Sequence, residues 1–208
     1  MPTFQNEDEQ QGIVLGVDEV GRGPLAGPVV AASVYVPKEI RAHPFISDIR
    51  DSKKLSKPKL KILNALIHEF CIVSIAECSP QEIDKHNILK ASLYAMKRSI
   101  ENINITPDFA LIDGNKIPMD LSIRAKSIVK GDSISKSIAA ASIVAKFYRD
   151  KVMEDLSFEF PHYGWERNVG YPTEQHRNAI NKYGITPHHR KSFSPVRNYM
   201  ESIIKNVS

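Results

Sequence analysis

Residues 13–23 read Ile-Val-Leu-Gly-Val-Asp-Glu-Val-Gly-Arg-Gly, and this stretch predicts both a strand and a chemical site. An apolar run bounded by glycine is typical of a short buried strand. Two adjacent acids, Asp18 and Glu19, follow this run and precede a predicted turn made by Gly21, Arg22 and Gly23. Buried acids need a partner, and a metal ion is a good candidate. The alternative interpretation is an acidic strand end before an ordinary glycine turn.

Adjacent positions on a strand point to opposite faces of the sheet. Asp18 and Glu19 are therefore expected to share one site only if the pleat breaks near Glu19, which Gly21 and Gly23 would permit.

The composition predicts one compact domain over residues 1–208. A chain of this length with 42% hydrophobic residues can bury a substantial core. The formal net charge of +4 is compatible with a polyanionic partner such as a nucleic acid. Residues 1–11 are polar and acidic, which predicts a disordered tail and shows no secretory signal. No segment is long and apolar enough to cross a bilayer, so no membrane association is expected.

The two cysteines predict a reducing, cytoplasmic environment. Cys71 and Cys78 lie within one predicted strand, where seven steps separate them by roughly 23 Å. That distance is far beyond the reach of a disulfide, so both are expected to be reduced thiols.

Strand and helix patterns then alternate along the chain. Predicted strands occupy 13–17, 28–37, 71–77, 108–113 and 122–128, and predicted helices occupy 57–67, 87–101 and 133–158. From about residue 161 to residue 208 the pattern indicates helix and loop. The predicted fold class is therefore α/β, with a mixed five-stranded sheet flanked by helices and a helical C-terminal lobe.

Two further acids stand at element ends. Asp113 ends the fourth predicted strand before a glycine, and Asp132 precedes the long helix. If the strands are neighbours, these acids meet Asp18 and Glu19 at one sheet edge. Oxygen ligands without histidine or cysteine spacing favour Mg²⁺ or Mn²⁺ over zinc, and two such ions about 3.5–4 Å apart suit phosphodiester hydrolysis. Alternatively, Asp113 is a turn residue and Asp132 is the N-cap of the helix.

Several segments together resemble the type 2 ribonucleases H, the family of bacterial ribonuclease HII. In chain order these segments are 18–30, 51–56, 111–115, 130–132, 137–146 with 149–150, 170–173 and 189–193. The resemblance implies a ribonuclease H-like fold. It also implies that four acids are catalytic and bind Mn²⁺ or Mg²⁺, two ions being held when substrate is bound: Asp18, Glu19, Asp113 and Asp132.

The resemblance also implies a substrate-binding set. The backbone of Gly21, Arg22 and Gly23 is implied to contact the ribose 2′-hydroxyl, which distinguishes RNA from DNA. Tyr171 is implied to stack on the sugar of the following deoxynucleotide. Without the resemblance, a half-buried structural tyrosine would be the expectation.

The implied activity is that of an endoribonuclease. It would degrade the RNA strand of RNA/DNA hybrids and nick 5′ to ribonucleotides embedded in duplex DNA, as in ribonucleotide excision repair, leaving 3′-hydroxyl and 5′-phosphate ends. Type 3 relatives differ at the position of Arg22 and carry an extra N-terminal domain, whereas only about a dozen residues precede the first strand here. The rival hypothesis is a non-catalytic module that binds RNA/DNA hybrids. We expect a monomer, and no replication or repair partner is identified.

Other residues give weaker signals. Four basic residues are candidates for phosphate contacts by charge alone: Lys53, Lys54, Lys146 and Arg190. Four histidines share no metal-binding spacing and are expected on the surface or in loops: His162, His176, His188 and His189.

Overall fold

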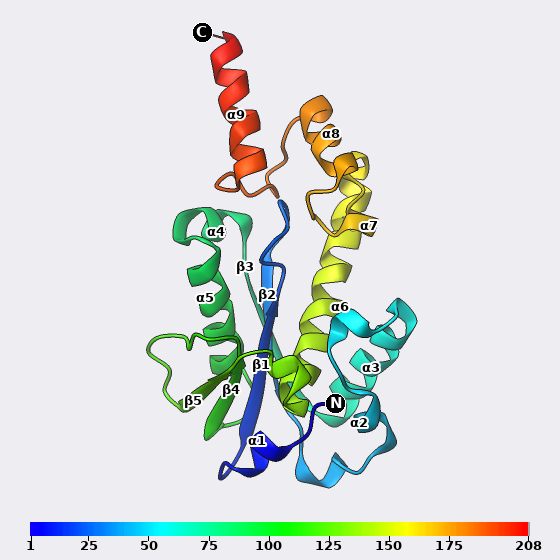
Figure 1. The fold of residues 1–208 in the computed structure, drawn as a ribbon, viewed down its shortest axis with the longest axis vertical. Helices are drawn as coiled ribbons and strands as arrows, with labels where there is room; N and C mark the ends of the chain where they lie inside the picture. The colour runs from blue at the N-terminus through cyan, green and yellow to red at the C-terminus, as the bar shows by residue number, and fades with distance from the viewer. Residues whose placement is uncertain (208) are drawn as a thin grey trace. The chain divides into compact units, whose positions relative to one another are not determined.

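A mixed five-stranded sheet organises the first part of the computed structural model, which describes residues 1–207 (Figure 1). The strands are β1 Val14–Val20, β2 Val29–Tyr35, β3 Ile72–Cys78, β4 Phe109–Asp113 and β5 Arg124–Ile128, in the spatial order β3-β2-β1-β4-β5. Strand β1 is antiparallel to β2 and parallel to β4, which is parallel to β5. The predicted mixed sheet is confirmed.

Helices fill the connections and the C-terminal part of the chain. The α-helices are α1 Gln5–Asp8, α2 Pro44–Asp48, α3 Lys57–Phe70, α4 Pro80–His86, α5 Ile88–Glu101, α6 Lys136–Glu159, α7 Trp165–Asn168, α8 Glu174–Tyr183 and α9 Ser194–Val207. Short 3₁₀ turns are η1 Lys38–Ile40, η2 Ser52–Lys54, η3 Gly131–Ser133 and η4 Pro161–Tyr163. Among the described residues, no helix combines the length and the apolar character that crossing a membrane would require.

Helix α6 begins three residues later than the sequence predicts. Residues Gly131–Ser133 form the turn η3 instead, and the hydroxyl of Ser135 accepts a hydrogen bond from the Ile138 N–H at 3.2 Å. Ser135 therefore has the geometry of the N-cap. The alternative that Asp132 caps this helix is wrong, because Asp132 lies inside η3, ahead of the cap.

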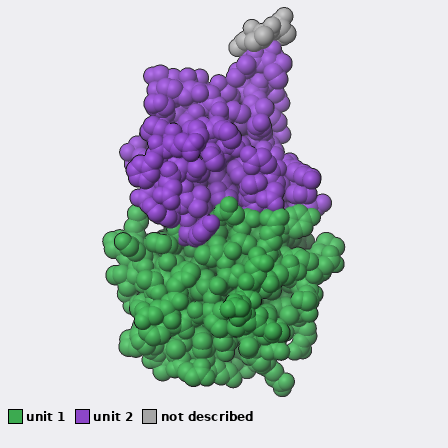
Figure 2. All heavy atoms as spheres, turned by 180° about the vertical axis from the view of Figure 1, so that it is seen from behind, with its two compact units in different colours: residues 1–20, 30–77, 92–147 green, residues 21–29, 78–91, 148–208 purple. Residues whose placement is uncertain are grey.

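The chain forms two compact units, which Figure 2 colours separately. Unit 1 comprises residues 1–20, 30–77 and 92–147 and contains most of the sheet. Unit 2 comprises residues 21–29, 78–91 and the chain from Tyr148 onward, including the glycine turn at 21–23 and helices α7 to α9. The acids predicted to bind metal all belong to unit 1, and the residues predicted to contact substrate all belong to unit 2.

In unit 1, helices cover both faces of the sheet. Val30, Ala32 and Val34 alternate along β2 and pack in one apolar cluster with residues of α3 and α6. On the opposite face, the Ser33 hydroxyl hydrogen-bonds the Ser99 hydroxyl of α5 at 2.7 Å. In Figure 1, α3 and α6 accordingly lie on one side of the strands and α5 on the other.

Helix α6 approaches β1 unusually closely. A Cβ atom added to Gly16 would overlap the backbone of Ser137 and Ile138, so only glycine fits at this point of the strand. The alanines at 139–141 are fully buried, which lets the helix lie flat on the sheet. This contact brings α6 alongside the strand that carries Asp18.

Residues 1–11 do not form the disordered tail that their polar composition predicts. Thr3 forms a bridge with Ser135, and residues 5–8 form α1. The buried Glu7 carboxylate accepts hydrogen bonds from the Ser135 hydroxyl at 2.6 Å and from the Ser137 N–H at 2.9 Å. The segment is ordered because its acid satisfies an N–H group that every helix start leaves unpaired.

The cysteines agree with the prediction. Cys71 and Cys78 are buried, and no disulfide joins them. Burial raises the pKa of the Cys71 thiol to about 12, so this thiol is protonated at neutral pH.

Two histidines in unit 2 are buried rather than exposed. The Trp165 Nε1–H donates to His176 Nε2 at 3.1 Å, and His189 Nε2 lies 3.1 Å from the same nitrogen. The Thr186 N–H donates to His189 Nδ1, and His176 Nδ1 lies 3.0 Å from the Tyr171 carbonyl oxygen. These contacts fit two neutral rings, with His189 protonated on Nε2 and His176 on Nδ1, in which the single lone pair of His176 Nε2 is shared by the Trp165 and His189 donors. The expectation of surface or loop histidines is wrong for His176, which is buried in α8, whereas His189 does lie in a loop but is buried there.

We expect the free energy of unfolding to decrease as the pH falls below about 6.5. Burial, together with the nearby His176 and His188, lowers the pKa of His189 to about 3, whereas the unfolded chain titrates near the ordinary value of about 6.5. Between these values the unfolded state binds more protons, so stability is complete above the unfolded pKa and is lost as the pH falls. The loss from pH 7.5 to pH 5 is roughly 2 kcal/mol.

Urea unfolding across this pH range measures the effect. His189→Gln should flatten the pH dependence, while the exposed His162→Gln should leave it unchanged. An identical pH dependence in wild type and His189→Gln would contradict the prediction.

Candidate metal centre

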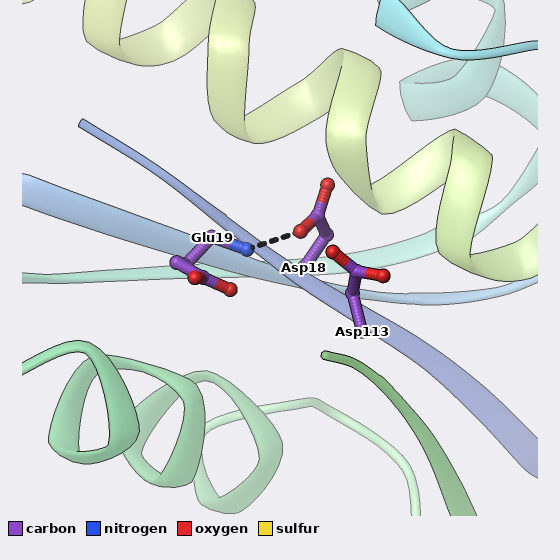
Figure 3. Close-up of side chains that lie close together, drawn as sticks. All are labelled: Asp18, Glu19 and Asp113. Atoms are coloured by element: carbon purple, nitrogen blue, oxygen red, sulfur yellow. Dashed lines mark hydrogen bonds between the residues drawn. The ribbon is translucent and has the colours of Figure 1, made fainter. Parts of the chain in front are cut away.

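Three predicted acids converge at the end of the parallel pair β1 and β4. The last paired residues are Val17 and Ile112, so the next residues, Asp18 and Asp113, leave neighbouring strands side by side. Oxygen atoms of Asp18, Glu19 and Asp113 all lie within 4.8 Å of one another (Figure 3). The predicted convergence of these three carboxylates is therefore present in the structure.

The pleat break expected near Glu19 does not occur. The pairing of β1 with β2 continues without interruption through Asp18, Glu19 and Val20, opposite Ala32, Ala31 and Val30. Because the pairing of β1 with β4 ends at Val17, β1 is open on that side from Asp18 onward. The two side chains meet at this open edge, and the Glu19 N–H donates to Asp18 Oδ1 at 2.7 Å. An uninterrupted strand with one unpaired edge thus replaces the predicted backbone irregularity.

Asp18 is the acid of this cluster whose negative charge is most disfavoured by its surroundings. Burial raises the pKa of its carboxyl well above the ordinary value, and the charges of Glu19 and Asp113 raise it further. Hydrogen bonds from the Ser142 hydroxyl and the Glu19 N–H act in the opposite direction. Asp18 is only 6% exposed and lies beside two like charges, so its site favours the binding of a cation.

A chain of two hydroxyls holds the Asp18 carboxylate. Ser142 of α6 has a single hydroxyl proton, which it donates to Asp18. The Ser52 hydroxyl of η2, 2.9 Å away, must then donate to Ser142. Both serines are buried, so the Asp18 carboxyl faces a hydroxyl of α6 instead of solvent on this side.

Asp132 lies beside the three-acid cluster rather than within it. Asp113 Oδ1 accepts a hydrogen bond from the Gly131 N–H at 2.6 Å, which ties the turn η3 to the end of β4. Burial raises the pKa of Asp132, and the charges of Asp113 and Asp51 add to this effect, so the carboxyls are electrostatically coupled. Asp132 is not among the residues whose oxygens lie within 4.8 Å of one another, and its part in the metal site stays a prediction.

The donor set fits a divalent cation. All three side chains offer carboxylate oxygens, which Mg²⁺ and Mn²⁺ prefer. Two oxygens bound to one Mg²⁺ are at most about 4.2 Å apart, since each bond is about 2.1 Å long.

In unit 2, Tyr171 lies against the glycine turn. A Cβ atom added to Gly23 would lie 3.4 Å from Tyr171 Cε1, so the ring borders this glycine. Arg22 and Gly23 are exposed, and Tyr171 is 46% exposed. Gly21 has φ +92°, a backbone conformation that favours glycine. Of the residues predicted to contact substrate, Arg22, Gly23 and Tyr171 are therefore accessible within this unit, whereas Gly21 is buried.

The basic candidates divide into two classes. Lys53 and Lys54 are exposed, and the charge of Lys53 acts on the pKa of Asp132, so this lysine is close to the acids. Arg190 is fully buried, and its hydrogen bonds go to backbone carbonyls, so the phosphate contact suggested by its charge is wrong. Sequence reasoning also missed Ser52 and Ser142, whose only signal was a position inside the motifs around the acids.

Comparison with known proteins assigns the family. The family model described as Ribonuclease HII matches residues 15–196. The ribonuclease HII of Ruegeria pomeroyi is 55% identical over 183 residues, which cover 88% of this chain and 76% of that protein. The ribonuclease HII of Zymomonas mobilis is 47% identical over 207 residues, covering 98% and 94% of the two chains.

Solved structures agree on the fold. The ribonuclease H2 of Pyrococcus horikoshii superposes with a TM-score of 0.80 at 24% identity, covering 94% of this chain and all of that one. The ribonuclease HII in the PCNA complex from Archaeoglobus fulgidus gives a TM-score of 0.72 at 27% identity, covering 88% and 96%. The chain belongs to the ribonuclease HII family, the divalent-metal-dependent endoribonucleases that degrade the RNA strand of RNA/DNA hybrids.

Proposed function

We propose that the chain cleaves at the cluster of Asp18, Glu19 and Asp113, and that it nicks duplex DNA 5′ to embedded ribonucleotides as well as degrading hybrids. The products are 3′-hydroxyl and 5′-phosphate ends. The observation that supports the proposal is the convergence of three carboxylates within 4.8 Å at the open end of β1.

The acids bind the metal in the proposed mechanism. Asp18, Glu19, Asp113 and Asp132 would hold Mg²⁺ or Mn²⁺, two ions in all when substrate is bound. A bound divalent ion supplies Lewis-acid stabilisation of the charge that develops on the phosphate and lowers the pKa of water. Ser142 and Ser52 keep the Asp18 carboxylate in one orientation, so that its oxygen is aligned before the substrate arrives.

Recognition of the ribonucleotide is assigned to unit 2. The backbone of Gly21, Arg22 and Gly23 contacts the 2′-hydroxyl, and Tyr171 stacks on the neighbouring deoxyribose. The exposure of Arg22 and Tyr171, and the position of the Tyr171 ring beside Gly23, support this assignment.

The remaining proposals concern organisation. We treat the chain as one catalytic domain with a helical C-terminal lobe, because the family model spans residues from both units. We propose a monomer in the cytoplasm, where buried cysteine thiols stay reduced. A replication protein is the proposed partner, since the Archaeoglobus fulgidus relative forms a complex with PCNA.

One assay tests the proposed function. A labelled DNA duplex with a single ribonucleotide, and a continuous RNA/DNA hybrid, are incubated with the protein in Mg²⁺, in Mn²⁺ and in EDTA. Metal-dependent nicking on the 5′ side of the ribonucleotide supports the proposal. Binding of both duplexes without nicking in either metal would support the non-catalytic module instead.

Replacing Tyr171 with alanine should reduce nicking at a single ribonucleotide about tenfold, because contacts of one aromatic ring contribute about 1–2 kcal/mol. Cleavage within a continuous hybrid, which lacks the deoxyribose junction, should fall less. Tyr171→Phe should retain the preference, since the ring is unchanged. Tyr183→Ala is a matched control, because Tyr183 is 47% exposed in the same unit. Equal losses on both substrates would argue against junction sensing.

A further inference from the structure

Unit 2 contains two fully buried arginines whose hydrogen bonds go to backbone carbonyls instead of acids. Arg149 is 1% exposed and Arg190 is 0% exposed. Burial lowers the pKa of Arg149 to about 10 and that of Arg190 to about 9, so both guanidinium groups are charged at neutral pH. Burying a charge is costly unless its hydrogen bonds are satisfied. The acceptors of these bonds therefore show what the two charges organise.

Arg190 hydrogen-bonds to the backbone carbonyls of the glycine turn. Its Nη2 donates to the Gly21 carbonyl at 2.6 Å, and its Nη1 donates to the Arg22 carbonyl at 3.1 Å. Its remaining bonds reach the carbonyls of Gly27 at 3.0 Å and Pro28 at 3.1 Å. One planar group thus fixes both ends of the segment from Gly21 to Pro28.

These contacts determine where the N–H groups of the turn point. In a trans peptide the C=O and the following N–H point in opposite directions. Because the carbonyls of Gly21 and Arg22 face the Arg190 guanidinium, the N–H groups of Arg22 and Gly23 point away from it. Arg22 and Gly23 are exposed, so the side of the turn away from Arg190 is the accessible one.

Arg149 links the same loop to the segment before Tyr171. Its Nε donates to Pro28 at 2.9 Å and its Nη2 to Ala26 at 3.0 Å, both at the carbonyl oxygen. Its Nη1 donates to the Val169 carbonyl at 3.0 Å. Gly21 is packed so tightly on this side chain that a Cβ atom there would overlap Arg149 Nε.

The segment held by Arg149 is strained. Val169 has φ +42°, an unfavourable conformation for a β-branched residue. The next residue, Gly170, accepts a hydrogen bond from the Leu25 N–H at 2.7 Å and has no room for a Cβ atom, which would lie 2.6 Å from the Ala26 oxygen. Strain of this kind persists only where surrounding contacts impose it. Here those contacts bring Tyr171 to the edge of Gly23.

We propose that Arg149 and Arg190 are positioning residues for ribonucleotide recognition, which hold the N–H groups of the glycine turn and the Tyr171 ring in one fixed arrangement. The inference rests on the proposed function of these two groups. It assigns the discrimination between ribose and deoxyribose to a rigid backbone, whose rigidity comes from two side chains that never touch the substrate.

Binding selectivity tests this inference. The dissociation constants for a duplex with one ribonucleotide and for the identical all-DNA duplex are measured in Ca²⁺, to separate binding from cleavage. Arg190→Lys and Arg149→Lys keep the charge but donate from one nitrogen, which cannot span the separate carbonyls. We expect the preference for the ribonucleotide to fall about fivefold in each variant, the contribution of about one hydrogen bond. Mn²⁺ binding at the acids of unit 1 should not change.

Two further variants separate positioning from general destabilisation. Ile180→Ala removes buried apolar contacts from the same unit without touching the turn, and it should keep the wild-type preference despite a lower Tm. Arg190→Gln leaves no unpaired charge in the interior, which limits the loss of stability. The glutamine amide can donate to fewer carbonyls than the arginine guanidinium. All assays are run well below the Tm of each variant.

The outcomes are distinct. Wild-type protein that binds both duplexes equally would overturn the proposed function and this inference together. Wild-type protein that prefers the ribonucleotide, with Lys and Gln variants that prefer it equally, would overturn the inference alone. A preference lost in the arginine variants and kept in Ile180→Ala supports it.

Discussion

Asp113→Asn is expected to reduce nicking by about a thousandfold while leaving the protein folded. The substitution removes one of the three carboxylates that lie within 4.8 Å of one another, and with it the charge that would hold a divalent cation. The side-chain oxygen that accepts the Gly131 N–H bond remains, so the contact between β4 and η3 is kept. The loss should therefore appear in catalysis and metal affinity rather than in structure.

The same substitution should stabilise the metal-free protein. The charge of Asp113 raises the pKa of both Asp18 and Asp132, which means that these like charges repel one another in the folded state. Removing one charge relieves this repulsion by about 1 kcal/mol, a gain that is common when a functional site is neutralised. Thermal unfolding in EDTA measures this effect.

Asp120→Asn is the matched control, because Asp120 is an exposed aspartate of the same unit with φ +56°, which asparagine tolerates. It should retain both activity and Tm. Full activity in Asp113→Asn would remove this residue from the proposed site, and a large loss of Tm would attribute its effect to folding instead.

Removing divalent metal should abolish nicking of both substrates, and adding Mg²⁺ or Mn²⁺ should restore it. Without a cation, the clustered acids repel the phosphate that the reaction must approach. A cation that binds only the folded state also stabilises it by mass action, by about 2.7 kcal/mol at a hundred times its Kd. The wild-type Tm should therefore rise with added metal.

The comparison of variants makes this measurement specific. Metal should raise the Tm of Asp113→Asn much less than that of wild type, and Asp120→Asn should respond like wild type. Nicking that persists in excess EDTA, with a Tm that no divalent ion changes, would be incompatible with a metal centre at these acids.

The strand pattern of the sequence predicts part of the acid site but not all of it. The apolar run before Asp18 and the run before Asp113 predict two strands that end in acids, and the structure places these ends side by side because β1 and β4 are parallel neighbours. The strand pattern could not show that the β1–β4 pairing stops at Val17. That single feature opens the edge at which Asp18 and Glu19 meet, so a pleat break is unnecessary.

The sequence by itself determined the mixed sheet, the main helices, the acidic cluster and the family, because periodicity, glycine turns and motif order are local properties of the chain. Only the tertiary structure decided the roles of Glu7, His189 and Arg190. From the sequence, Glu7 is expected in a disordered tail, His189 on the surface or in a loop, and Arg190 is a candidate phosphate contact. Glu7 and Arg190 are buried by partners distant in sequence, Ser137 for Glu7 and the Gly21 carbonyl for Arg190. His189 is buried by His176 and by the nearby turn at Thr186, which the fold packs together. The local sequence around a polar side chain does not show whether that side chain will be buried. Whether it contacts solvent or a buried hydrogen-bond partner depends on which other segments the fold packs against it.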